Sequence, residues 1–175
     1  MLRLLSCLSS RVRRFVPVAS GMVLVALGSP SSTQAQGGGA PPSGHGAMVM
    51  GFDQDSAVHH FHLYVDGGRI EVVAKHATDG KTRDEIRMHL RHLAGMFAGG
   101  DFSDPTLVHE PEHVPGTTVL STRRAAIRYA YHDVPSGGRV DITTRDAAAL
   151  TALHEFLKYQ IAAHHTGDSL VPTRR

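Results

Sequence analysis

Histidine and methionine are the side chains of this sequence that most clearly carry chemistry. The chain has 13 histidines and six methionines among 175 residues, and its one cysteine is Cys7. Imidazole and thioether groups bind transition metals, and thioether sulfur favours Cu(I). We therefore expect a metal site, for copper first and for zinc or nickel otherwise. A disulfide scaffold or a cysteine nucleophile is not expected.

Three groups of side chains support this metal prediction. Two histidines lie two positions apart in an alternating stretch, so they point to the same side and can hold one ion. Between positions 85 and 96, helical spacing places a carboxylate, two imidazoles and a thioether on one strip. A third group lies in a Gly/Pro-rich tail, which would capture metal and deliver it to the domain. The candidate ligands are His60 and His62; Glu85, His89, His92 and Met96; and His45, Met48 and Met50.

Each group has a purely structural alternative. Histidines on a sheet face are ordinary, a polar strip beside an apolar stripe covers the edge of a core, and the tail is then a plain linker. His164, near a predicted helix end, is typical of a capping or core histidine. If metal does bind, the imidazoles must be neutral. We therefore expect the affinity to fall as the pH drops through about 6.5.

Motifs for catalysis are absent from the sequence. His154-Glu155 does not open a zinc-protease motif, because position 158 is lysine. No phosphate-binding loop, dinucleotide-binding glycine pattern or serine nucleophile elbow is present. A small hydrolase using Glu85 or Glu155 with a histidine has no motif behind it. We lean towards a protein that is not an enzyme.

The alternative function is a non-catalytic interaction module of the cell envelope that needs no metal. An open sheet face would present His60, His62 and Tyr64 to a protein, to a small apolar ligand or to a second copy in a homodimer.

Residues 1–35 have the order of a secretory signal peptide. Three arginines (Arg11, Arg13 and Arg14) precede an apolar run that ends near Gly28, and small residues follow up to Ala35. The run is shorter than the ~20 residues of a membrane span, so we expect cleavage after Ala35 and no lasting anchor. The prediction is a periplasmic or secreted protein, exported by the general or the twin-arginine route.

The mature chain is slightly acidic. The signal segment contains four arginines, the three named above and Arg3. Without them the 18 basic residues become 14, against 16 acidic residues, which gives a net charge of −2. Nucleic-acid binding needs clustered lysine and arginine, so we expect no nucleic-acid partner.

The elements that must position these residues follow the same order twice. Residues 58–65 alternate between apolar and polar, a glycine turn follows, and residues 70–74 alternate in return, which predicts a β-hairpin. Thr82 to Glu85 matches a capping box that opens a helix, and Gly99-Gly100 ends it. The second half repeats this with strands near 127–131 and 140–142 and a helix that ends at Gly167.

The two glycine turns also match in sequence, since residues 67–72 and 137–142 agree in residue type at every position. We therefore expect an α+β fold made of a duplicated ββα unit, with a four-stranded antiparallel sheet and two helices on one face. Leu107 to His109 would form a short edge strand between the halves. The predicted organisation is a flexible tail over 36–57, one domain over 58–168 and a disordered C-terminus over 169–175.

Several motifs in order resemble an uncharacterised family of small exported bacterial proteins. The resemblance covers roughly residues 48–168 and implies export and one compact domain, with no established activity. It rests on Met50-Gly51-Phe52-Asp53-Gln54, His59-His60-Phe61, Ile86-Arg87 with His89-Leu90 and His92, Met96-Phe97, His154-Glu155-Phe156-Leu157 with Gln160-Ile161, and Thr166-Gly167-Asp168.

Overall fold

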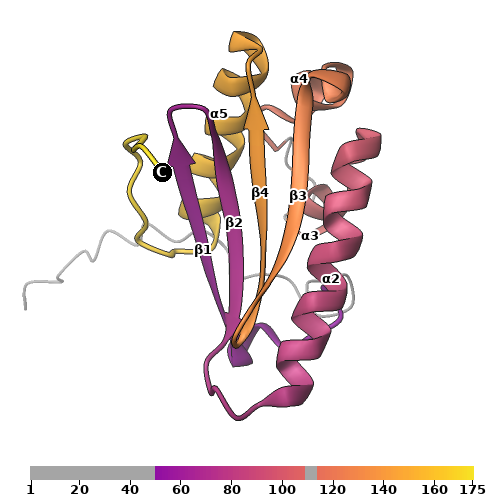
Figure 1. Ribbon diagram of the computed structural model, residues 1–175, viewed down its shortest axis with the longest axis vertical. Coiled ribbons are helices and arrows are strands. Elements are labelled where there is room, and N and C mark those ends of the chain that lie inside the picture. Colours follow the sequence, from indigo (N-terminus) through magenta and orange to yellow (C-terminus); the bar gives the residue numbers. More distant parts are fainter. Residues whose placement is uncertain (1–49, 109–113) are drawn as a thin grey trace, which may run out of the picture. The chain divides into compact units, whose positions relative to one another are not determined.

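The computed structural model describes residues 50–108 and 114–175 and confirms the predicted α+β fold (Figure 1). Four strands form one antiparallel sheet in the order β1-β2-β4-β3. The elements are η1 (Gln54–Ser56), β1 (Ala57–Tyr64), β2 (Gly67–Ala74), α2 (Gly80–Gly99), α3 (Ser103–Val108), α4 (Thr117–Thr122), η2 (Arg124–Ala126), β3 (Ile127–Val134), β4 (Gly137–Thr144) and α5 (Ala147–Ala163).

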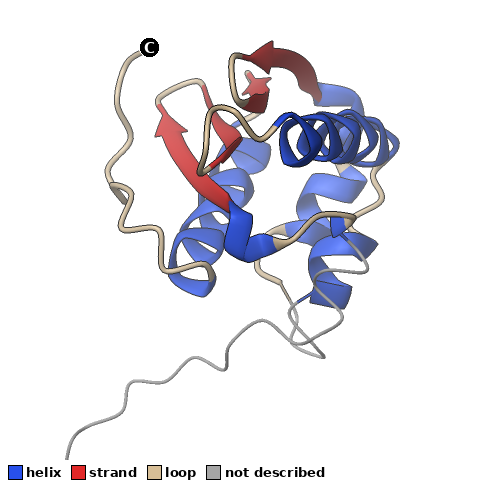
Figure 2. Cartoon of the chain, turned by 90° about the horizontal axis from the view of Figure 1, so that it is seen from below, coloured by secondary structure: helices blue, strands red, loops and turns tan. Residues whose placement is uncertain are grey.

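The two long helices cover one face of the sheet, as the alternating strands predict (Figure 2). On that face the strands contribute Phe61, Leu63, Ile70 and Val72 of the first hairpin, and Val140 and Ile142 of the second, all buried. Burial of this apolar surface is the main force that holds helices and sheet together. The opposite face carries the polar side chains of the same strands. None of the helices in residues 50–108 and 114–175 combines the length and the hydrophobicity of a membrane-spanning segment.

Each long helix packs mainly on the hairpin of the other half of the chain. Helix α2 contacts β3 and β4, and α5 contacts β1 and β2. The glycine turns show how close this packing is. A Cβ atom on Gly68 would lie 2.3 Å from the Leu157 side chain of α5, and one on Gly138 would lie 3.2 Å from the Leu90 side chain of α2. The duplication therefore relates two intertwined units.

The helix starts agree with this duplication and correct one sequence prediction. Helix α2 is capped by Asp79, which accepts a hydrogen bond from the Thr82 backbone N–H at 3.0 Å. Helix α5 is capped in the same way by Asp146, which accepts from the Ala149 N–H at 2.9 Å. Thr82 is a buried residue inside the first turn, so the predicted capping box that starts at Thr82 is wrong.

Helix α5 ends before the predicted stop at Gly167. The chain turns at His165, whose φ of 51° is left-handed, and the Thr166 N–H donates to the Ile161 carbonyl at 3.2 Å. This is the pattern of a Schellman C-cap, in which glycine usually holds the left-handed position. The turn directs the chain towards β1.

The connection between the halves is helical, so the predicted edge strand at Leu107 to His109 is wrong. Residues 103–108 form α3, whose first N–H donates to the Asp101 carboxylate at 2.9 Å. Pro105 lies in the first turn, where a helix tolerates proline. His109 lies outside the described residues.

The folded domain is longer than its predicted limits of 58 and 168. Met50 and Phe52 are buried in the core, and the chain enters β1 directly after η1. At the other end, Thr173 forms an isolated parallel bridge with Tyr64, so residues after 168 contact the sheet. Residues 36–49 of the predicted tail and the predicted signal segment lie outside the described residues.

Candidate functional site: a pocket lined by imidazoles

The predicted ligands on β1 lie on the open face of the sheet. The rings of His60 and His62 are stacked with centroids 6.1 Å apart, and His62 stacks in turn on Tyr64. The Nδ1 atom of His60 lies 3.1 Å from a carboxylate oxygen of Asp168. The three rings stack in a row along β1, and the Asp168 carboxylate already contacts the His60 ring.

The predicted strip on α2 is divided between different surroundings. Glu85 accepts a hydrogen bond from Lys81 at 2.6 Å, and His92 is exposed. Met96 packs against the core, and His89 lines a pocket. Within residues 50–108 and 114–175, no three His, Cys, Asp or Glu side chains are grouped so as to hold a metal ion. His45 and Met48 lie outside the described residues.

Another set of histidines meets at a pocket between the sheet and the two long helices. His59 enters from β1, His89 from α2 and His164 from the C-cap of α5, and the Met50 side chain joins them. We call this set the imidazole pocket. The His59 and His164 rings stack with centroids 4.8 Å apart, and Phe52 lies 5.7 Å from His89. Apolar side chains form most of the remaining wall, with Asp104 and Gln160 as further polar residues.

The duplicated fold places an aromatic cluster at the equivalent position of the other half. There, Phe97 of α2 lies 5.8 Å from Tyr129 of β3 and 5.9 Å from Phe156 of α5, centroid to centroid. Phe102 stacks on Phe97 at 4.3 Å. This end of the core is filled by aromatic rings, which bury a large apolar area.

The caps Asp79 and Asp146 align helix α2 with helix α5, and Gly67 and Gly137 align the first hairpin with the second. Under that alignment the three members of the aromatic cluster, Phe97, Tyr129 and Phe156, correspond to His164, His59 and His89. The fold accepts plain aromatic rings at these positions. Packing in the repeated fold therefore does not by itself require imidazoles at these positions.

Burial favours the neutral form of two of the pocket imidazoles, those of His59 and His89. The pKa of His59 is lowered from 6.5 to about 4, first because the ring is desolvated and then because His89 and His60 lie nearby. Burial also lowers the pKa of His89, although Asp104 opposes this shift. A neutral imidazole has a free nitrogen lone pair, which is the form that binds a metal or accepts a hydrogen bond.

The pocket is small. It encloses about 60 Å³. A dry cavity of ~150 Å³ admits benzene, whereas ~10 to 15 Å³ is enough for one water molecule. The volume therefore suits an ion or a few water molecules.

Sequence reasoning missed the imidazole pocket as a set. It assigned no role to His59, and it interpreted His164 as a capping or core histidine. His164 is the C-cap residue of α5, but the bond from its backbone N–H to the Gln160 carbonyl, at 2.9 Å, is one that any residue makes at this position. The signal that could have found the set was the duplication. Extended from the hairpins to the helices, it aligns both histidines with aromatic residues.

A scan against protein-family models gave no match, and searches of curated proteins and of solved structures gave none either.

Proposed function

We propose that this chain is an exported, periplasmic or secreted protein that binds a transition-metal ion, with copper as the preferred ion. We further propose that the imidazole pocket is the binding site. The observation that carries the proposal is the replacement of an aromatic cluster by three histidines at the equivalent end of a duplicated fold. His59, His89 and His164 come from three different elements, so no short motif explains their meeting.

The chemistry of the pocket favours copper over harder ions. Neutral imidazoles suit copper, zinc and nickel, and the thioether of Met50 adds a preference for Cu(I). Apolar walls limit access of water and raise the strength of electrostatic interactions inside the pocket. The ligand set proposed here is His59, His89 and His164 with Met50, so it keeps only His89 from the predicted strip on α2 and only Met50 from the predicted tail group. Because no three such ligands of the described residues are grouped to hold an ion in the metal-free chain, the ion would have to draw them together.

Metal binding by the mature chain can be measured directly. We expect equilibrium dialysis against Cu(I), Cu(II), Ni(II) and Zn(II), followed by metal analysis, to give one tightly bound ion, copper before the others. Substituting His59→Tyr together with His164→Phe should weaken that binding at least tenfold, about 1.4 kcal/mol. These changes copy Tyr129 and Phe97 of the other half, so the fold should persist.

The matched control is His62→Ala together with His92→Ala. These rings lie on the open face and on the exposed side of α2, and we expect their loss to leave the affinity unchanged. A stoichiometry below one for all four ions would overturn the proposal. A loss of binding in the control, with none in the pocket variant, would return the site to the exposed strips.

A further inference from the structure

The C-terminal segment extends the sheet at its β1 edge. The Val65 N–H donates to the Thr173 carbonyl at 3.0 Å, and the Thr173 N–H donates to the Leu63 carbonyl at 3.0 Å. Further back, the Asp168 carboxylate accepts from the Phe61 N–H at 2.8 Å. β1 is an edge strand, and these contacts use backbone groups that an edge strand leaves open.

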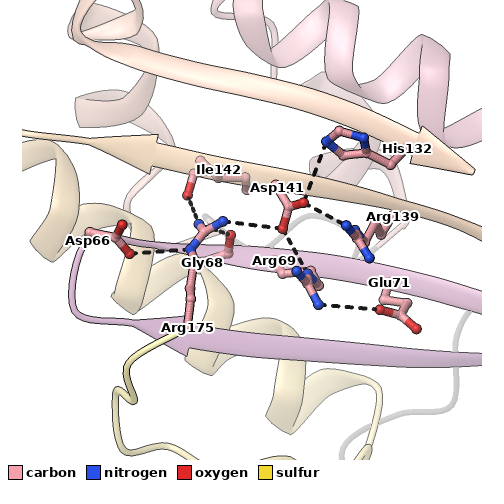
Figure 3. A network of polar contacts seen from close by, with 9 residues as sticks. All are labelled: Asp66, Gly68, Arg69, Glu71, His132, Arg139, Asp141, Ile142 and Arg175. Atoms are coloured by element: carbon pink, nitrogen blue, oxygen red, sulfur yellow. Dashed lines mark hydrogen bonds and ion pairs between the residues drawn. The ribbon is translucent and has the colours of Figure 1, made fainter.

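Arg175 ends this segment in a site made by strands and turns on the open face (Figure 3). Its guanidinium donates to the Ile142 carbonyl at 2.9 Å and to the Gly68 carbonyl at 3.4 Å. The carboxylates of Asp66 and Asp141 each lie 3.4 Å from it. The Tyr64 ring lies beneath, 4.6 Å from the guanidinium carbon. We call Tyr64, Asp66, Gly68, Asp141 and Ile142 the arginine site.

The central carboxylate of the arginine site is held in place by residues outside the C-terminal segment. Asp141 accepts from the Arg69 Nε at 2.8 Å and from the Arg139 Nε at 3.1 Å, and its side chain is only 12% exposed. Gly68 and Ile142 are paired residues of β2 and β4, so their carbonyls are also fixed by the sheet. A site that is organised before its ligand arrives loses less entropy on binding.

The chemistry of this surface selects one kind of ligand. The Asp66 carboxylate, two carbonyls and an aromatic face match the charge, the planar fork of donors and the stacking preference of a guanidinium, while Asp141 shares its charge with Arg69 and Arg139. The open edge of β1 matches an extended backbone that runs parallel to it. The β1 edge and the arginine site therefore bind two residues of one peptide that lie two positions apart, as Thr173 and Arg175 do.

We infer that the β1 edge and the arginine site form a docking surface for an extended, arginine-containing peptide of a partner protein. The chain's own residues 169–175 occupy this surface as an intramolecular competitor. A tethered segment acts at an effective concentration near the millimolar range, so a partner must release it before docking. The surface lies on the opposite face of the sheet from the imidazole pocket and does not depend on metal.

A peptide titration of the full chain tests this inference. The probe is an N-acetylated, fluorescently labelled peptide with the sequence of residues 169–175, followed by fluorescence anisotropy. The released variant combines Thr173→Pro, which removes the N–H that bonds to Leu63, with Arg175→Ala. We expect this variant to bind the probe at least tenfold more tightly than the wild-type chain.

Three controls make the result specific. The chain variant Arg174→Ala should behave as wild type, because Arg174 is an exposed neighbour outside the arginine site. A probe whose last arginine is replaced by alanine should bind the released variant at least tenfold more weakly. Adding Asp66→Asn to the released variant should weaken the intact probe, and this exposed position should leave the circular dichroism spectrum unchanged.

Equal binding of both probes, or no gain in the released variant, would overturn the inference. A wild-type dimer that Arg175→Ala converts to a monomer in light scattering would also overturn it, and would assign the surface to the C-terminal segment of a second copy. The titration is done without metal, so its failure is distinct from a failure of the imidazole pocket to bind copper.

Discussion

At the scale of single residues, His59 carries a cost in stability at acidic pH that its counterpart Tyr129 does not. An imidazole with a lowered pKa in the folded chain binds a proton more readily once the chain unfolds. Between the folded pKa of about 4 and the unfolded value of about 6.5, the unfolded state therefore holds the extra proton. The stability that His59 contributes is present above 6.5 and is lost as the pH falls towards 4. The same shift moves the expected loss of metal at this ligand below the earlier estimate of 6.5.

This cost can be measured as a dependence of stability on pH. We expect the wild-type free energy of unfolding to fall between pH 6.5 and 4 by up to about 3 kcal/mol more than that of His59→Phe. Urea denaturation of the metal-free protein at several pH values gives both curves. His92→Ala, an exposed histidine of α2, serves as the control and should follow the wild type. Parallel curves for wild type and His59→Phe would contradict the prediction.

At the scale of elements, the predictions from sequence were correct where a pattern repeats over many residues. The alternation of Phe61 and Leu63, and the helical spacing of Ile86 and Leu90, each report a buried face directly. Helices α3 and α4 have six residues each, too few for a period to show. The imidazole pocket joins residues more than a hundred positions apart, and the spacing of residues within one element cannot reveal such contacts.

The close approach of the two hairpins depends on glycine. A Cβ atom at Gly137 would lie 2.0 Å from the Val72 carbonyl oxygen, a backbone atom that cannot move aside alone. We expect Gly137→Ala to lower the free energy of unfolding by about 3 kcal/mol or more. Gly95→Ala, on the exposed side of α2 with nothing near its Cβ, should raise it by up to about 1 kcal/mol. Chemical denaturation compares the two, and equal effects would show that the hairpins have room to separate.

At the scale of the whole molecule, the crossed helices make each half dependent on the other. The apolar face of the first hairpin is covered mainly by α5, and that of the second by α2. Each ββα unit buries only a minor part of its own sheet face with its own helix, through contacts of α2 with β2 and of α5 with β4. A single unit therefore lacks most of the burial that stabilises the fold.

Fragments test this dependence. We expect residues 36–110 and residues 111–175, made separately, to show little regular structure by circular dichroism. Mixed in equal amounts, they should regain the spectrum of the intact chain and elute together in size-exclusion chromatography. A folded monomeric fragment on either side would contradict the intertwined packing.

The crossed helices also set the order of events during synthesis. The first hairpin leaves the ribosome with its apolar face uncovered, and its cover, α5, is complete only after the 89 residues from Lys75 to Ala163 have been added. At typical rates of translation this takes roughly 5 to 20 seconds. During that interval Ile70 and Val72 remain accessible to chaperones, to proteases and to neighbouring nascent chains. The chain therefore folds as a whole only after nearly all of it has been made.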